Sequence, residues 1–257
     1  METERIMTAY YNPKRTRNLF DPLSSKPYKI SRSKLDLFMR CARCFYIDRR
    51  LGVGQPPGYP FNLNSAVDAL LKKEFDCYRE QQKPHPLMLE NNINAIPFAH
   101  SKMDEWRDSL RRGIQYHIPE TNIILTGGVD DVWIDINTHE LIIVDYKATS
   151  KTETVSLDAE WQIGYKRQAE IYQWLFRQNG FSVSDTVYFI YCNGRTDLDS
   201  FDKKLLFSIS VLPYVGNADW VESAIDKANA CLSDSEIPAY GTECDFCRYA
   251  LALKEIN

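Results

Sequence analysis

The chain has 257 residues, of which 44% are hydrophobic and 26% are charged, and its formal net charge at pH 7 is −4. This composition is typical of a globular domain and excludes a disordered chain, a collagen or a coiled coil as the main state. No apolar run approaches the ~20 residues that a membrane-spanning helix requires, and the first ten residues lack the apolar core of a secretory signal, so we expect a cytoplasmic protein. The negative net charge also argues against a polycation that coats DNA indiscriminately.

Basic residues nevertheless gather near the N-terminus. Residues 1–50 carry twelve Lys or Arg against five Asp or Glu, so the rest of the chain has an excess of negative charge. Two interpretations remain open: a basic part that contacts phosphate beside an acidic part that binds metal, or a solvated basic tail.

The first part of the chain is expected to be a flexible leader. Over residues 1–29 several prolines stand among polar residues, and no hydrophobic periodicity appears. After it, Ser33 and Asp36 resemble a capping box, and apolar residues recur at helical spacing up to Phe45. Glycines and prolines within residues 52–57 should end this first helix.

The remaining pattern alternates between helical and β-branched segments. The expected elements, in chain order, are helices over residues 64–81 and 103–112, strands over 123–125, 129–136 and 141–146, a long helix over 159–178, strands over 186–192 and 205–212, and a helix over 217–232. The first three strands should form an antiparallel meander. Because no internal repeat or linker is visible, this order predicts a single α/β domain over residues 30–257 with an N-terminal helical elaboration.

Charged residues lie on two neighbouring strands of this expected sheet. Asp130 follows Gly127 and Gly128 in one strand, and Asp145 and Lys147 lie near the end of the next. Because side chains alternate along a strand, Asp145 and Lys147 should point to the same face. Asp145 also ends a run apolar enough to be buried on both faces, where a charge is costly unless it is paired or bound to metal.

Two carboxylates that converge in this way suit a hard cation such as Mg²⁺, whose other ligands are a backbone carbonyl, waters and a substrate phosphate. Such a metal polarises a phosphoryl oxygen and acidifies a water, and Lys147 would hold that water or stabilise charge on the phosphate. The alternative is a structural Asp–Lys pair on a surface hairpin.

Four of the seven cysteines form two C-x-x-C pairs near opposite ends of the chain, Cys41 with Cys44 and Cys244 with Cys247. An odd cysteine count in a reducing compartment argues against a disulfide framework. Four thiolates suit either Zn²⁺ or an iron–sulfur cluster, and four reduced thiols without metal are the third possibility. A bound metal would clasp the two ends of the chain around the core.

Several of these features occur in the order typical of a known family. A G-x-x-D motif, a D-x-K motif and a helix with Q-x-x-x-Y resemble the PD-(D/E)XK nuclease superfamily, and in particular its RecB-like branch, which includes the CRISPR-adaptation and RecB-type exonucleases. The resemblance covers about residues 28–253. The segments that carry it are Gly127–Asp130, Asp145–Lys147, Gln168–Tyr172 with Tyr165 one turn earlier, Ser31–Leu35, Cys41–Tyr46 and Cys244–Tyr249.

This resemblance implies a restriction-endonuclease-like core, with a central mixed β-sheet flanked by helices, that cleaves DNA phosphodiesters with Mg²⁺ or Mn²⁺. Asp130 and Asp145 would bind the metal together with the backbone carbonyl of Tyr146. Lys147 would position the attacking water.

Other residues near this centre are expected to brace it or to contact nucleic acid. The resemblance implies that Gln168 and Tyr172 brace the lysine or touch the substrate, with Tyr165 as a further contact. Arg49 and Arg50 follow an aromatic pair, and we expect them to face solvent or phosphate. By resemblance, the enzyme acts as an exonuclease or on single strands, in DNA repair, recombination or defence. No G-x-x-x-x-G-K-[ST] motif is present, so any helicase would be a separate partner.

Two departures from the family pattern matter. Where the branch usually has a metal-binding His before the meander, this chain has Asp68, either a replacement ligand or a surface residue. A weakened metal site would make the protein a nucleic-acid- or partner-binding module of the same fold. The branch often binds a 4Fe–4S cluster with one N-terminal and three C-terminal cysteines, but Leu253 stands where the third would fall. Cys44 would then supply the missing ligand.

Overall fold

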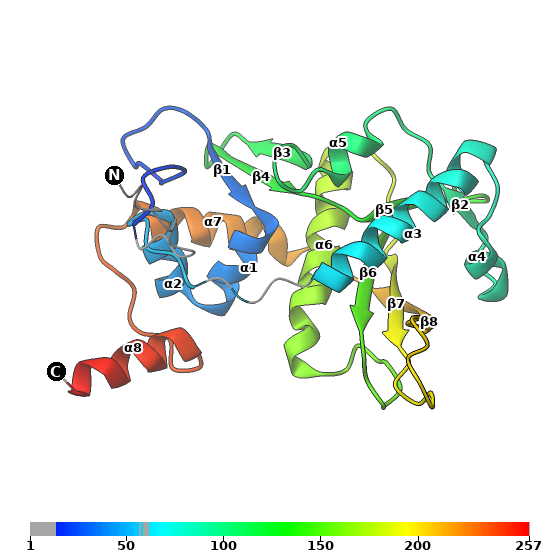
Figure 1. Cartoon of the computed structure of the whole chain (residues 1–257). Coiled ribbons are helices and arrows are strands. Elements are labelled where there is room, and N and C mark those ends of the chain that lie inside the picture. The colour runs from blue at the N-terminus through cyan, green and yellow to red at the C-terminus, as the bar shows by residue number, and fades with distance from the viewer. Residues whose placement is uncertain (1–13, 57, 59–61, 257) are drawn as a thin grey trace, which may run out of the picture.

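The computed structural model describes residues 14–56, 58 and 62–256, in which helices pack against two β-sheets (Figure 1). The strands are β1 (Tyr28–Ser31), β2 (Ala95–Pro97), β3 (Ile114–Ile118), β4 (Ile123–Gly127), β5 (Asp131–Asp135), β6 (Leu141–Thr149), β7 (Thr186–Gly194) and β8 (Phe207–Val215). The helices are α1 (Arg32–Arg40), α2 (Ala42–Arg49), α3 (Asn62–Gln81), α4 (Pro86–Glu90), α5 (Met103–Arg107), α6 (Ile163–Gln178), α7 (Trp220–Ser233) and α8 (Asp245–Ile256). The α/β class expected from the sequence is confirmed.

The larger sheet is mixed and has the strand order β2-β5-β6-β7-β8. Strands β6 and β7 run parallel, whereas the other neighbouring pairs in this sheet are antiparallel. Helix α3 crosses one face of this sheet, and α6 lies beside β6 on its other side (Figure 1).

Strand β6 is buried on both faces, as its apolar run predicted. Leu141 and Ile143 belong to the core that includes α6, whereas Ile142 and Val144 pack in a second core with Phe75 of α3. Because side chains alternate along the strand, the next two odd-numbered positions belong to the α6 face. These positions are Asp145 and Lys147, which therefore lie on the same side of β6 as α6, just beyond the apolar residues of the core.

The first expected helix is divided in two at Cys41. Its backbone is extended (φ −161°, ψ 103°), and its Sγ accepts a hydrogen bond from the Cys44 N–H at 3.4 Å, which caps α2. The expected capping box of Ser33 and Asp36 is wrong, because α1 already begins before Ser33 and no side chain caps it. Asp36 instead pairs with Arg40 at 3.0 Å.

The expected three-stranded meander is wrong in its first strand. Strands β5 and β6 form the hairpin, but β4 lies in a second sheet of order β1-β4-β3. The chain crosses from one sheet to the other at Gly127 and Gly128. A Cβ on either glycine would lie 2.5 Å from a neighbouring side-chain carbon, so this crossing requires residues without side chains. The short strands β2 and β3 were not expected.

Strand β1 lies within the region expected to be a leader. It pairs in parallel with β4 from Tyr28 onward. Residues 14–27 form no helix or strand, and Arg15 among them donates a hydrogen bond to Asp48 of α2 at 2.9 Å. Residues 1–13 lie outside the described part of the chain.

The expected helices over residues 64–81, 159–178 and 217–232 are present, whereas α4 and α8 were not expected. Helices α3 and α6 have nearly the expected bounds, but α5 ends at Arg107 instead of residue 112. Within the residues that the structure describes, no helix has the combination of length and hydropathy needed to cross a membrane.

Asp48 gathers three positive charges around one buried carboxylate. Its Oδ1 lies 2.9 Å from both Arg15 and Arg49, and its Oδ2 lies 2.7 Å from Lys34. Burial alone would raise the pKa of this carboxyl, but the hydrogen bonds and charges of Arg49 and Lys34 outweigh burial and lower the pKa to about 2.

Because this pKa is lower in the folded than in the unfolded protein, Asp48 stabilises the fold fully above pH ~4, and this stabilisation is lost as the pH falls toward ~2. We predict that Asp48→Asn lowers the free energy of unfolding by about 2 kcal/mol at pH 6, and that the difference from wild type narrows between pH 4 and 2. Urea unfolding across this range measures the effect, with the exposed Asp21→Asn as control. A difference that does not change with pH would contradict the assignment.

Candidate active site

Strand β6 places Asp145 and Lys147 on one face, beside α6. Asp145 is buried, and its Oδ2 forms a close ion pair with the Lys147 ammonium. Its Oδ1 is also buried and has no hydrogen-bond partner in the described chain. The Lys147 ammonium lies 4.5 Å from the centre of the Tyr165 ring, so α6 limits its position from the other side.

Asp130 lies in the turn between Gly128 and β5, not in the strand as expected. Its Oδ2 accepts a hydrogen bond from the backbone N–H of Tyr146 at 3.0 Å, which fixes this carboxylate against the end of β6. The Asp130 side chain is 22% exposed, so one side of it remains accessible from the cleft.

The electrostatics of the two β6 residues are coupled. Burial raises the pKa of Asp145, and the negative charge of Asp130 raises it further, while Lys147 and Arg32 act in the opposite direction. Burial tends to lower the pKa of Lys147, but Asp145 and Asp130 outweigh it, so the net direction is upward. The lysine therefore stays charged, whereas the surroundings of Asp145 on balance disfavour its negative charge, because burial outweighs the nearby cations.

The Q-x-x-x-Y motif of α6 braces the turn that carries Asp130. Tyr172 is buried and donates a hydrogen bond from its hydroxyl to the Gly128 carbonyl at 2.5 Å. Gln168, one turn earlier, lies 3.5 Å from the Tyr172 hydroxyl and lines the cleft. The Tyr172 ring also occupies the space that a side chain on Gly127 would need. The glycine and tyrosine motifs are thus one packing arrangement.

On α3, Asp68 faces the same cleft. Lys72, one turn later, lies 2.8 Å from Asp68 and 3.6 Å from Asp130, so its ammonium stands between the two carboxylates. Glu74, on another face of α3, instead contacts His85 at 2.9 Å. The sequence analysis did not identify Lys72. Its i, i+4 spacing from Asp68 on one helix was the signal that could have found it.

These residues line one cleft in two parts. A cavity of about 500 Å³ opens between α3, β6 and α6. A second hollow of about 260 Å³ continues past Asp130 toward the start of α1. Both parts share Arg32, Asp68, Asp130 and Gln168. The structure thus brings Asp68, Asp130, Lys147, Tyr165, Gln168 and Tyr172 to the cleft walls, with Asp145 buried behind Lys147.

Asp131, the neighbour of Asp130, has a separate structural role that the sequence did not reveal. It is fully buried and pairs with Arg79 and Arg107, and it accepts a hydrogen bond from the Tyr146 hydroxyl at 2.8 Å. Its carboxylate oxygens are thus already paired with side chains of the protein. Asp130 is therefore the residue of the pair that remains available to a ligand.

Arg49 and Arg50 are not in the cleft. Arg49 is buried and pairs with Asp48, so the expectation that it faces solvent or phosphate is wrong. Arg50 donates hydrogen bonds to the backbone carbonyls of Leu232 and Asp234 at the end of α7. Arg32 instead lines both parts of the cleft.

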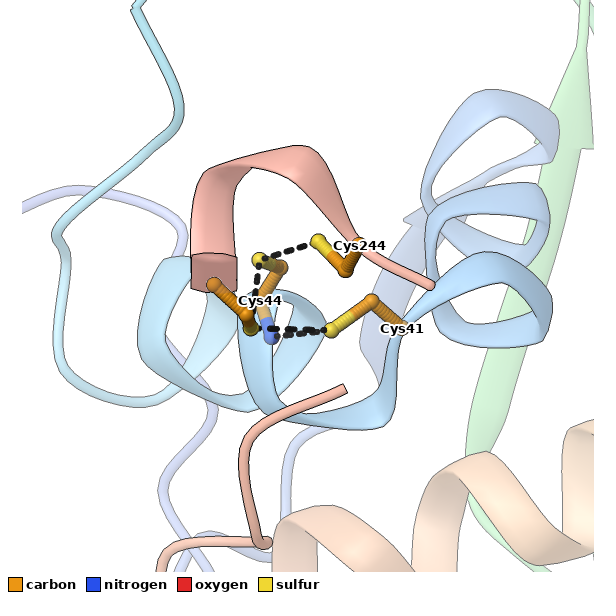
Figure 2. Close-up of side chains that lie close together, drawn as sticks. Cys41, Cys44 and Cys244 are labelled. Atoms are coloured by element: carbon orange, nitrogen blue, oxygen red, sulfur yellow. Dashed lines mark hydrogen bonds between the residues drawn. The ribbon is translucent and has the colours of Figure 1, made fainter. Parts of the chain in front are cut away.

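The two C-x-x-C pairs meet at a second site (Figure 2). Cys41 and Cys44 lie at the start of α2, and Cys244 and Cys247 lie at the start of α8. Their four Sγ atoms all lie within 4.8 Å of one another, and none is in a disulfide. This site can hold metal and joins the two ends of the described chain, as the sequence predicted.

The fold, with two aspartates and a lysine converging beside a cleft, is of the kind found in metal-dependent nucleases. A family model for the PD-(D/E)XK nuclease superfamily matches residues 29–251, and the chain belongs to this superfamily. Membership implies a nuclease with a divalent metal and a nucleic acid substrate. No curated protein matches the chain.

We predict that Gly127→Ala destabilises the protein by about 1–3 kcal/mol, because the added Cβ would lie 2.5 Å from a ring carbon of the buried Tyr172. Gly164→Ala is the matched control, since a Cβ there meets nothing within 4 Å. Thermal and urea unfolding measure both variants. A Gly127→Ala protein as stable as wild type would show that the two motifs are not packed together.

Proposed function

We propose that the protein is a Mg²⁺- or Mn²⁺-dependent deoxyribonuclease that hydrolyses phosphodiester bonds in DNA. The observation that carries the proposal is the convergence of Asp130, Asp145 and Lys147 beside a cleft that also contains Arg32. Its support is geometric: Asp130 is fixed against β6 by a backbone N–H, and Lys147 is paired with Asp145.

A divalent metal fits these residues. Asp145 Oδ1 is buried without a donor, which is costly unless a cation completes its surroundings. Asp130, Asp145 and the backbone carbonyl of Tyr146 would hold the metal, a set of hard oxygen ligands that suits Mg²⁺ or Mn²⁺. When bound, the metal polarises the phosphate and acidifies a water.

Lys147 has the charge and position to assist hydrolysis. Its side chain is only 14% exposed, and it is held between Asp145 and the Tyr165 ring. From there its ammonium would donate a hydrogen bond to the attacking water, or to the phosphate oxygen on which negative charge develops. Arg32 and Lys72 would bind neighbouring phosphates of the strand in the second part of the cleft.

Asp68 is proposed as a further metal ligand in place of the histidine expected there. Lys72 already places a positive charge between Asp68 and Asp130, at 2.8 Å and 3.6 Å. The two carboxylates therefore face one position that a cation can occupy. A metal ion there would compete with the lysine ammonium, unless the lysine moves to a substrate phosphate.

The substrate and pathway are proposed from the resemblance to the RecB-like branch. On that basis the enzyme degrades DNA from ends or as single strands, in repair, recombination or defence. The 257-residue sequence has no nucleotide-binding G-x-x-x-x-G-K-[ST] motif, so a helicase that exposes single strands would be a separate partner.

The second candidate function is a nucleic-acid- or partner-binding module of the same fold with a weakened metal site. The ion pairs of Lys72 favour it, because an internal cation partly replaces the charge of a metal. Such a module would bind DNA in the cleft without cleaving it.

We predict that purified protein cleaves labelled single- or double-stranded DNA with Mn²⁺, and that Lys147→Ala lowers the cleavage rate by about 10²–10³-fold. The exposed Lys227→Ala is the matched control and should keep full activity. Absence of cleavage by wild type, together with retained DNA binding, would favour the binding module. Equal cleavage by Lys147→Ala would remove the lysine from the mechanism.

We also predict that Lys72→Ala tightens Mn²⁺ binding by about tenfold, because it removes a positive charge next to two carboxylates. Lys73→Ala, exposed at the next position of α3, is the control. Electron paramagnetic resonance of free Mn²⁺ measures the affinity without any cleavage assay. Unchanged affinity in Lys72→Ala would mean that Asp68 and Asp130 do not share one cation position.

A further inference from the structure

The four-cysteine site has a geometry that distinguishes between metals. The Sγ atoms of Cys41 and Cys247 lie 3.6 Å apart, those of Cys44 and Cys244 lie 3.6 Å apart, and those of Cys44 and Cys247 lie 3.9 Å apart. These separations are far longer than the ~2.0 Å of a disulfide bond, so the thiols are not oxidised in pairs. They are the separations of four ligands that face a common centre.

A single tetrahedral ion fits this arrangement. With zinc–sulfur bonds of about 2.3 Å, the sulfurs of a tetrahedral site stand about 3.8 Å apart. In a 4Fe–4S cluster each thiolate binds a different iron at the corners of a cube, and the cube itself separates the sulfurs much more widely. All four Sγ atoms here lie within 4.8 Å of one another, which leaves no room for such a cube. The spacing therefore favours a single ion over the iron–sulfur cluster expected by resemblance.

We propose that Cys41, Cys44, Cys244 and Cys247 bind one zinc ion that attaches α8 to α2. Zinc is favoured because four thiolates at tetrahedral spacing are its typical structural site. The site is independent of the nuclease centre and of the function proposed for it.

Contacts with neighbouring residues hold the four cysteines in place, and those neighbours are not themselves metal ligands. Cys41 is held extended between α1 and α2, so that its Sγ accepts the Cys44 N–H. Gly241 allows the segment before Cys244 to approach Cys41 closely, since a Cβ at this position would lie 3.2 Å from Cys41 Sγ. Arg43 of α2 donates a hydrogen bond to the Pro238 carbonyl at 2.8 Å and stacks 3.7 Å from the Tyr240 ring.

Besides the cysteine site, helix α8 contacts the preceding segment through Lys254, whose ammonium lies 5.1 Å from the centre of the Tyr240 ring. Cys247 is the only buried residue in the helix, and α8 lies at one end of the molecule beyond α2 (Figure 1). Five of its apolar side chains are exposed instead of packed in the core, namely Phe246, Tyr249, Leu251, Leu253 and Ile256. The helix therefore buries little apolar surface, and the metal would supply a large part of its attachment to α2.

The test is the metal content of protein purified without oxygen from cells supplied with both iron and zinc. We expect about one zinc per chain by mass spectrometry, with neither iron nor acid-labile sulfide. Replacement by Co²⁺ should give the intense visible bands of a tetrahedral thiolate site. About four irons with sulfide and a brown chromophore, or no metal, would overturn the proposal.

Variants and hydrogen exchange locate the metal. Cys44→Ser and Cys244→Ser should lose zinc, whereas Cys77→Ser, an exposed cysteine outside the group, should keep it. Because a cysteine variant could fail to fold, wild type is also treated with a mercurial that releases thiolate-bound zinc. Amide exchange should then rise in α8 while α6 stays protected. Zinc release with unchanged exchange in α8 would show that the metal does not attach the helix.

Discussion

Asp145 lies where β6 leaves the core, with both carboxylate oxygens buried and with Lys147 and Arg32 supplying positive charge. The strand that carries it is packed between α3 and α6, so neither the residue nor the strand can move toward water without exposing apolar side chains. A carboxylate held in this way is stable only beside cations. Lys147 meets this need in part by pairing with Asp145, and Asp130 of the neighbouring turn lies against the end of the same strand. Both residues line the cleft.

Acidic residues that stabilise the fold are distinct from those that remain available to bind a ligand. Asp131 and Asp130 are adjacent in sequence, but the first is enclosed by Arg79, Arg107 and Tyr146, whereas the second receives one backbone hydrogen bond and faces the cleft. Tyr172 holds the turn between them and β4 through the Gly128 carbonyl. Losing this brace would move Asp130 relative to Asp145, so the packing of a buried ring sets the geometry of the acidic pair.

The sequence predicted those parts of the site that depend on local periodicity. Alternation along β6 placed Asp145 and Lys147 on one face, whereas Asp68, Gln168 and Tyr172 were identified only by the resemblance to the nuclease family. The parts that failed depend on contacts between distant segments. The burial of Arg49 follows from its ion pair with Asp48, and the break of the first helix at Cys41 follows from the distant cysteines that it meets. The passage of the chain between sheets at Gly127 depends on the Tyr172 ring, 45 positions away, and no local pattern encodes it.

The central claim is that Asp145 forms part of a divalent metal site, and its most direct test is a Mn²⁺ titration of purified protein followed by electron paramagnetic resonance. Wild type and Asp135→Asn, a change at the last residue of β5, should bind Mn²⁺ equally. Asp145→Asn should lose this binding while remaining folded by circular dichroism. Unchanged Mn²⁺ affinity in folded Asp145→Asn would contradict the account and leave the Asp145–Lys147 pair as a structural ion pair.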